Sequence, residues 1–162
     1  DAVEGVSTQD KKIASMIVKE KKGIIIAANK WDIAKEKGIQ FQNFKKDFYY
    51  FFPHISFSEL VPISAKTGYN KIKLLKNILT VYNNYNKKIR TNELNSLLQD
   101  HKLRSSRIKY GFQKSTAPPV FELFVGKEND CNTNFKRFII NLIRKKFDLK
   151  GVPFDVILRI GK

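Results

Sequence analysis

The sequence predicts an α/β fold in which a parallel sheet, covered by helices on both faces, is followed by a small α+β unit. Three observations predict it. Helix-like and strand-like patterns alternate over the first 90 residues, which is typical of parallel sheets. Two of the strand-like segments are unbroken apolar runs, as in strands buried on both faces. A polar run, "NNYNKKIRTN" at 83–92, then separates this part from a second series of elements.

The first elements are a capped helix and a buried strand. Ser7 or Thr8 can cap a helix whose apolar residues Ile13, Met16 and Ile17 recur at helical spacing. Gly23 ends that helix, and residues 23–28 form an apolar run without alternation. We therefore expect a central strand over 23–28.

An aromatic segment follows, with phenylalanines at helical spacing up to Pro53, which stops the helix: Phe41, Phe44, Phe48 and Phe51 or Phe52. Base stacking is one interpretation of these rings, and a helix packing face is the favoured one. A second strand is predicted over 60–64. Asn70 then caps a helix that carries Ile72, Leu75, Ile78, Leu79, Tyr82 and Tyr85.

The polar run sets the predicted domain boundary, giving units 1–90 and 91–162. In the second unit, Thr91 caps a short helix and strands are predicted over 107–114, 120–126 and 153–160. Pro118 and Pro119 form a turn between the first two strands, and Thr133 caps a helix that precedes the third. The resulting α-β-β-α-β unit of about 70 residues is large enough to fold as a domain.

The charge is strongly positive: the chain has 31 Lys and Arg residues and 15 acidic residues, for a net charge of +16. It is spread over both units: residues 1–90 carry 17 basic and 8 acidic groups, and residues 91–162 carry 14 and 7. This balance favours a polyanionic partner such as RNA, although a merely solubilising surface would look similar. No membrane-spanning segment, zinc-ligand spacing or possible internal disulfide is present, since Cys131 is the single cysteine. A cytoplasmic location is expected, with an organelle matrix as the alternative.

Polar side chains follow each of the two strands of the first unit, where ligands of parallel sheets bind. In "NKWD", the Asp32 carboxylate can accept both adjacent donors of guanine, its N1–H and its exocyclic amine. A buried site built for that pair rejects an analogue lacking it by roughly 10⁴-fold. Asn29 can bond the N7 edge of the base and brace neighbouring loops, and the stem of Lys30 can cover the purine face.

The second polar turn, "SAK", would complete the site from the neighbouring strand. The Ala65 amide can donate to guanine O6, Lys66 can cover the opposite side of the ring, and Ser64 can hold the loop in shape. The competing interpretation is that Asp32 caps the next helix and that both lysines are ordinary surface residues.

These two motifs resemble the fourth and fifth motifs of translation-factor-like P-loop GTPases. The stretch "DAVEGVSTQDKKIASMIVKEKKGIIIAANKWD" resembles, more narrowly, the second GTPase domain of the tandem-GTPase Der (EngA) family. The segments "KYGFQKSTAPPVFELFV" and "FKRFIINLIRKKFDLKGVPFDVILRIGK" resemble its C-terminal KH-like domain. The resemblance implies GTP or GDP as ligand and a role in assembly of the large ribosomal subunit, with rRNA as partner.

The phosphate-binding half of such a site is missing, because no G-x-x-x-x-G-K-[ST] string occurs. We expect this chain alone not to hydrolyse GTP. The native protein is expected to extend upstream of Asp1 into the rest of the GTPase domain, where the P-loop and the Mg²⁺ ligands would lie.

The last helix and its exit hold the candidate RNA contacts, since flexible and forked cations suit phosphates. The candidates are Lys136, Arg137, Arg144, Lys145, Lys146 and Lys150. A solvated helix face is an equal alternative, and no G-x-x-G loop of the usual KH kind occurs. The leading hypothesis is therefore a GTP-binding ribosome-assembly factor, and its rival is a non-enzymatic RNA-binding module with a vestigial guanine site.

Overall fold

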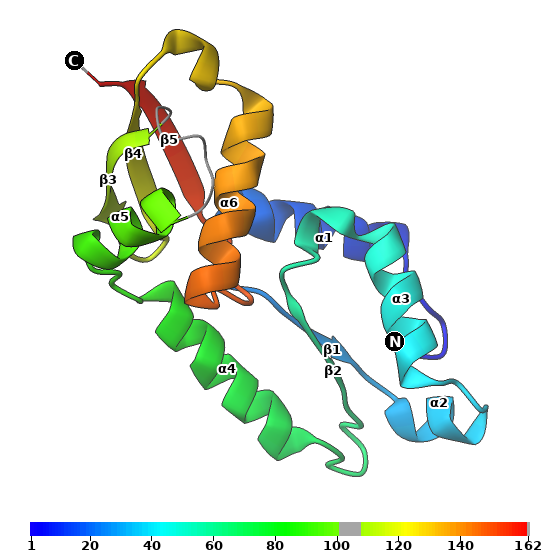
Figure 1. Ribbon diagram of the computed structural model, residues 1–162. Helices are drawn as coiled ribbons and strands as arrows, with labels where there is room; N and C mark the ends of the chain where they lie inside the picture. The colour runs from blue at the N-terminus through cyan, green and yellow to red at the C-terminus, as the bar shows by residue number, and fades with distance from the viewer. Residues whose placement is uncertain (101–107, 162) are drawn as a thin grey trace. The chain divides into compact units, whose positions relative to one another are not determined.

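The computed structural model describes residues 1–100 and 108–161 (Figure 1). The chain forms two compact units: unit 1 comprises Asp1–Asn83 and Lys150–Val152, and unit 2 comprises Asn84–Leu149 and Pro153–Lys162. The predicted division at residue 90 stays a prediction. The expected start of a strand at Arg107 lies outside the described residues.

Unit 1 contains a two-stranded parallel sheet of β1 (Ile25–Ala28) and β2 (Glu59–Pro62), paired from Ile25↔Glu59 to Ala28↔Pro62. Between the strands run α2 (Trp31–Glu36), α3 (Phe41–Phe51) and a short 3₁₀ turn, η1 (Pro53–Ile55). Helices α1 (Thr8–Lys19) and α3 lie on one side of the strands, and α4 (Lys71–Tyr85) lies on the other (Figure 1). The predicted parallel sheet with helices on both faces is confirmed.

The N-terminus of α1 shows why the sequence starts a helix there. The Ser7 hydroxyl accepts a hydrogen bond from the Asp10 amide at 3.1 Å, and the Asp10 carboxylate accepts one from the Ser7 amide at 2.9 Å. This reciprocal pair is a capping box, which satisfies two amides that the helix leaves without partners. These bonds hold the pKa of Asp10 below its usual range. Of the two predicted caps, Ser7 is therefore the one used.

The phenylalanines that recur at helical spacing in and just after α3 pack into the core of unit 1. Phe48 and Phe52 are buried and their rings stack at 4.6 Å between centroids, whereas Phe51 is half exposed. The packing interpretation of the phenylalanine pattern is confirmed for these two rings. By contrast, the apolar face of α4 is exposed along its length, at Ile72, Leu75, Ile78, Leu79 and Tyr82.

Unit 2 has the order α5 (Thr91–Asp100), β3 (Ile108–Ser115), β4 (Val120–Val125), η2 (Glu128–Asp130), α6 (Thr133–Phe147) and β5 (Asp155–Ile160). Its sheet runs β3-β4-β5, with β3 antiparallel and β5 parallel to β4. Residues of α5 and α6 share one core with the inward side chains Phe121, Leu123 and Val156. The predicted α-β-β-α-β order is confirmed.

The predicted caps of unit 2 are displaced by one residue. The cap of α6 is Asn132 and not Thr133, because the Asn132 side-chain oxygen accepts from the Phe135 amide at 2.8 Å. Asn is a somewhat better cap than Thr, and only Asn132 has the extended backbone that a cap requires. Thr91 is the first residue of α5, whose first intrahelical bond runs from Leu94 to the Arg90 carbonyl. None of the helices in the described ranges is long and apolar enough to cross a membrane.

Candidate functional site

The loops that follow β1 and β2 are joined by backbone hydrogen bonds. The Ile63 amide donates to the Ala28 carbonyl at 2.9 Å, and the Ile63 carbonyl accepts from the Trp31 amide at 2.9 Å. These two bonds continue the parallel pairing of the strands beyond their ends. The structure thereby brings the "NKWD" and "SAK" turns side by side, as the parallel arrangement requires.

Asn29 links three segments of unit 1. Its side-chain oxygen accepts a hydrogen bond from the Ala65 amide at 3.0 Å, and its carbonyl accepts from the Ala2 amide at 2.8 Å. Asn29 is thus a brace between the chain start, the first turn and the second turn. Because the Ala65 amide is engaged in this way, it is not available to a ligand at the same time.

Asp32 is the second residue of α2 and is half buried. Within residues 1–100 and 108–161, no hydrogen bond or ion pair engages its carboxylate. The competing interpretation, in which Asp32 caps the next helix, is wrong. Lys30 occupies the cap position of α2, and Asp32 lies inside the helix. Its carboxylate can accept hydrogen bonds from a ligand without first breaking a bond to a described residue.

Lys30 has a left-handed backbone, with φ of 61° and ψ of 35°, where non-glycine residues are uncommon. Its ammonium group forms an ion pair with the Asp1 carboxylate and lies 3.9 Å from a carboxylate oxygen of Glu4. The Asp1 carboxylate also accepts a hydrogen bond from the Val3 amide at 2.9 Å. The ammonium group is therefore held at the start of the chain, and the stem of Lys30 remains half exposed.

Ser64 shapes the second turn. It is 2% exposed; its hydroxyl accepts from the Thr67 amide at 3.2 Å, and its carbonyl accepts from the Gly68 amide at 2.9 Å. Lys66 lies at the exposed tip of this turn. Among the described residues, nothing accepts a hydrogen bond from the Lys66 backbone amide, so this turn presents a free donor next to the engaged amide of Ala65.

Sequence reasoning missed the two residues that hold the first turn in place, Trp31 and Asp1. Trp31 is 3% exposed, and its ring meets Phe41 and Phe44 edge-on, each at 5.5 Å between centroids. A large aromatic residue inside an otherwise polar motif is the signal that could have indicated this anchor. For Asp1, the signal is an acidic residue in the segment that pairs with Asn29, where it can form an ion pair with the neighbouring Lys30.

The comparisons with known proteins agree with this arrangement. A family model described as the KH-domain-like, C-terminal domain of EngA bacterial GTPase enzymes matches residues 88–159. GTPase Der of Nautilia profundicola is 37% identical over 98% of the chain and 36% of its own length. GTPase Der of Caldicellulosiruptor saccharolyticus is 34% identical over 98% of the chain and 38% of its own length. Residues 88–159 thus match the C-terminal KH-like domain of the EngA (Der) family, and nearly the whole chain is similar to GTPase Der.

The chain spans well under half the length of these Der relatives. GTPase Der of Lactobacillus helveticus, for example, is 32% identical over the whole chain, which covers 39% of the relative. Among solved structures, the chain resembles Era in complex with MgGDPNP and nucleotides of 16S ribosomal RNA, at 20% identity and a TM-score of 0.41, over 99% of this chain and 63% of that one. A likeness of that size supports no further conclusion.

The six candidate RNA contacts of the Der-like chain are not equivalent. Lys136 is paired with Asp155 at 2.8 Å. Arg144 donates to the Leu149 carbonyl and lies over the Phe154 ring at 4.7 Å, and burial lowers its pKa to about 10. Arg144 is therefore a packing residue of unit 2.

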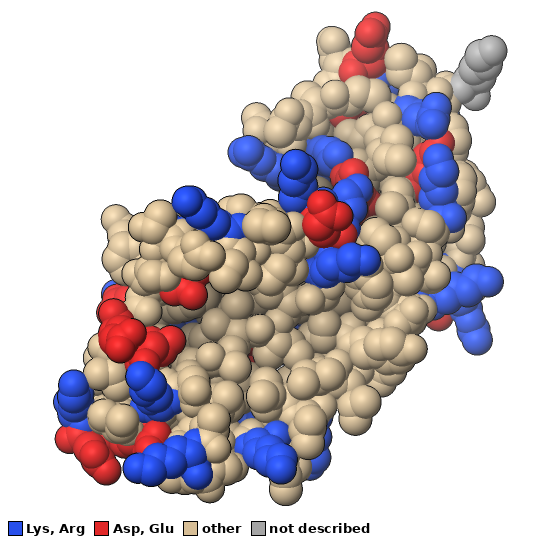
Figure 2. Space-filling model, turned by 180° about the vertical axis from the view of Figure 1, so that it is seen from behind, with Lys and Arg blue, Asp and Glu red and all other residues tan. Residues whose placement is uncertain are grey.

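The remaining candidates are exposed: Arg137, Lys145 and Lys146 on α6, and Lys150, which belongs to unit 1. On the face seen in Figure 2, Lys and Arg side chains stand among Asp and Glu side chains and do not merge into one continuous basic surface. The positive charge of the chain is therefore distributed on this face and not gathered there into a single patch.

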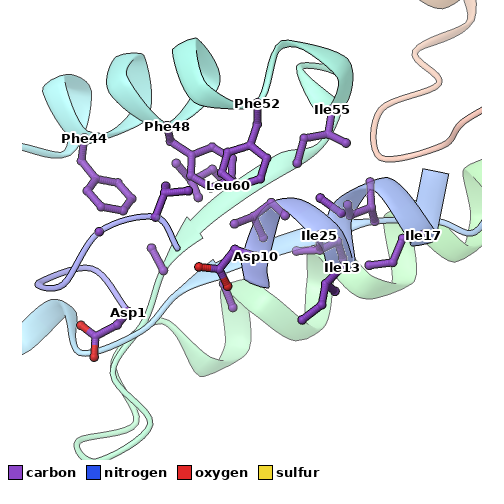
Figure 3. A pocket seen from close by; sticks show the side chains of 17 residues that line it. Asp1, Asp10, Ile13, Ile17, Ile25, Phe44, Phe48, Phe52, Ile55 and Leu60 are labelled. Atoms are coloured by element: carbon purple, nitrogen blue, oxygen red, sulfur yellow. The ribbon is translucent and has the colours of Figure 1, made fainter. Parts of the chain in front are cut away.

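A cavity of about 230 Å³ lies elsewhere in unit 1, between α1, β1 and α3 (Figure 3). Apart from Asp1 and Asp10, its lining is apolar, and it includes Phe44, Phe48, Ile24 and all four residues of β1. None of the six predicted base-contacting residues lines it. The described residues also contain no group of three or more His, Cys, Asp or Glu that could hold a metal ion.

Proposed function

We propose that this chain carries the base-recognition part of a GTP-binding domain joined to an RNA-binding KH-like domain. In the whole protein, GTP hydrolysis would be coupled to maturation of the large ribosomal subunit in the cytoplasm. The observation that carries the proposal is the half-buried Asp32 carboxylate, free of described partners and set beside the "SAK" turn. The name of the relatives, GTPase Der, supports it.

Recognition of guanine would use four groups of unit 1. Asp32 accepts from the N1–H and the exocyclic amine, and Asn29 faces the N7 edge while bracing the loops. The free backbone amide of Lys66 donates to guanine O6, because the Ala65 amide already donates to Asn29. The half-exposed stem of Lys30 covers one face of the ring while its ammonium keeps the Asp1 pair.

Phosphate binding and hydrolysis would need groups that this sequence does not contain, since it has no P-loop string. We propose that the rest of the GTPase domain, with the Mg²⁺ ligands, belongs to the upstream part of the same protein. Two features of unit 1 support this. The apolar face of α4 is exposed, and among the described strands β1 pairs with β2 alone. A parallel sheet of two strands with an uncovered helix gains stability from further strands and apolar partners.

The test is the substitution Asp32→Asn in the full-length protein. Two charge-assisted hydrogen bonds are worth roughly 1.5–3 kcal/mol each, so GDP affinity should fall by about 10²- to 10⁴-fold. Affinity for xanthosine diphosphate should rise, because its carbonyl replaces the amine and pairs with the new amide. Asp47→Asn on the exposed side of α3 is the matched control and should change neither affinity. Unchanged nucleotide preference in Asp32→Asn would refute the assignment.

A second candidate function is a non-enzymatic RNA-binding module whose guanine site is vestigial. The engagement of the Lys30 ammonium by Asp1 and of the Ala65 amide by Asn29 favours it, because both groups are then used within the protein. The full-length protein decides between the two: binding of GDP by calorimetry supports the first, and absence of binding together with retained rRNA affinity supports the second.

A further inference from the structure

The sheet of unit 2 has one face in the core and one face outside it. Along β4, Phe121, Leu123 and Val125 are fully buried against the helices, while the alternate residues Glu122 and Phe124 point to the other side. We call the second side the outer sheet face; it carries Tyr110 and Phe112 of β3, Glu122 and Phe124 of β4, Arg159 of β5, and Lys114 at the end of β3.

Three aromatic rings form the centre of the outer sheet face. Tyr110 and Phe124 are direct partners across the β3–β4 ladder, with centroids 6.5 Å apart. Phe112 lies 6.1 Å from Tyr110 and 6.4 Å from Phe124. The angles between the three ring planes are only 24–35°. The rings therefore lie as neighbours with similar orientation and do not bury one another.

The rings are accessible within this unit. Tyr110 is 47% exposed, and Phe112 and Phe124 are half buried. In the described part of the chain, nothing hydrogen bonds to the Tyr110 hydroxyl. Cross-strand aromatic pairs do stabilise a hairpin, but that role does not require a ring of this size to remain nearly half exposed.

Three cations lie on the strands that carry the three rings or on the strand beside them. Lys114 lies 3.2 Å from the Glu122 carboxylate, and Arg159 pairs with the same carboxylate from β5. Glu122 is 7% exposed, whereas the side chains of Lys114 and Arg159 are 50% and 56% exposed. The single acid is thus covered by two cations, which leaves an excess positive charge beside the rings. Lys109 adds a third cation near the start of β3, where its ammonium donates to the Gly161 carbonyl at 3.2 Å.

We propose that the outer sheet face binds single-stranded RNA, with bases stacked on Tyr110, Phe112 and Phe124 and phosphates held by the flanking cations. Every base has a π face, so such a platform is tolerant of sequence, and the positive rim complements the backbone charge. The proposal rests on the proposed RNA partner and adds to it a site, distinct from the cations of α6, and a single-stranded ligand. The similar orientation of the rings favours this ligand over a double helix, whose bases are not free to stack.

The test measures binding of fluorescein-labelled oligonucleotides of about 10 residues by anisotropy, with the full-length protein. The single strand should bind more tightly than an RNA duplex of the same sequence. Tyr110→Leu keeps apolar area but removes the ring face, and it should weaken single-strand binding by about 5- to 100-fold. Lys114→Gln should reduce the slope of log affinity against log salt by about 0.7, while Glu122 keeps its Arg159 partner. A DNA strand of the same sequence measures whether the 2′-hydroxyl contributes.

The matched control is Tyr50→Leu, which removes an 81% exposed tyrosine from α3 of unit 1 and should not change RNA binding. If Arg137→Gln with Lys145→Gln abolishes RNA binding while Tyr110→Leu has no effect, the outer sheet face is not the site and the proposed RNA partner stands. If the unaltered protein binds neither the single strand nor the duplex, both the outer-sheet-face proposal and the proposed RNA partner fail. GDP binding still tests the nucleotide site in that case. If Tyr110→Leu spares RNA but abolishes association with a protein partner, the face is a protein-docking surface and the proposal is overturned.

A second measurement does not depend on any variant folding. An oligonucleotide containing 4-thiouridine is photocrosslinked to the unaltered protein, and the crosslinked peptides are identified by mass spectrometry. Crosslinks within residues 108–125 support the proposal. Crosslinks confined to α6 overturn it.

Discussion

Gly151 gives the sharpest test of how unit 1 is built. Its amide donates to the Phe57 carbonyl at 2.8 Å, and its carbonyl accepts from the Ile24 amide at 2.7 Å. Its φ is +70°, and a Cβ added there would lie 2.3 Å from a methyl carbon of Val81 and 3.1 Å from the Ile24 carbonyl oxygen. Gly151→Ala must therefore both strain the backbone and displace a buried neighbour.

The magnitude follows from these two causes. A left-handed backbone costs an alanine about 1–2 kcal/mol, and overpacking a filled site costs about 1–3 kcal/mol. We expect Gly151→Ala to lower the free energy of unfolding by about 2–5 kcal/mol. Gly38→Ala is the matched control: its φ is +74°, but nothing lies within 4 Å of the added Cβ, so only the strain of about 1–2 kcal/mol applies.

The assay is urea unfolding followed by the fluorescence of Trp31, the single tryptophan of the chain, which is 3% exposed in unit 1. With a slope of about 2 kcal/mol per molar urea, Gly151→Ala should lower the midpoint by about 1–2.5 M and Gly38→Ala by less than about 1 M. A double-mutant cycle with Val81→Ala should show favourable coupling, because the smaller side chain makes room. Equal losses for the two glycine variants, without coupling to Val81, would refute the close approach at Gly151.

Two further outcomes are expected. The Tyr49 hydroxyl donates to the Ser58 carbonyl at 2.7 Å, and burial raises its pKa above the ordinary value near 10. The folded state thus holds this proton more tightly than the unfolded state, so its contribution is complete below pH 10 and is lost as the pH rises through the folded pKa. Tyr49→Phe should cost about 1 kcal/mol at neutral pH and remove that alkaline loss, measured by urea titrations at several pH values; parallel curves for both proteins would contradict it. Asn95 accepts from the Gly111 amide at 2.8 Å and donates to the Gly111 carbonyl at 2.9 Å, so Asn95→Ala should leave two buried backbone groups unpaired, at about 1–3 kcal/mol each. Faster hydrogen exchange at the Gly111 amide, absent in the exposed control Asn141→Ala, is the measurement, and unchanged exchange would count against the pairing.

Local patterns were enough to predict most of the fold. The helical spacing of Phe48 and Phe52 predicted a packing face, and both rings are buried. The apolar runs predicted parallel strands, and their order along the chain placed the two polar turns at one edge of the sheet. Such features depend on residues close in sequence and on the two periodicities of the backbone, so they can be read without a structure.

The same reasoning could not assign hydrogen-bond partners. It gave the Ala65 amide to the ligand, whereas this amide donates to Asn29, and it left Lys30 free, whereas its ammonium pairs with Asp1. Nor could local patterns show that Gly151 holds a tight backbone position between Ile24 and Phe57. In each case the partner is 29 or more residues away in the chain. The spacing of residues along the sequence does not give the distances in space that decide between competing partners.

The sequence by itself determined the classes of element, their order, and the presence of a carboxylate suited to guanine at the end of the first strand. Only the tertiary structure decided which groups near that carboxylate are free, which cations of α6 are exposed, and that three aromatic rings share the outer sheet face. The physical reason is that secondary structure follows from local sterics and hydrophobic spacing, whereas availability of a polar group depends on what the rest of the chain brings within about 3 Å of it.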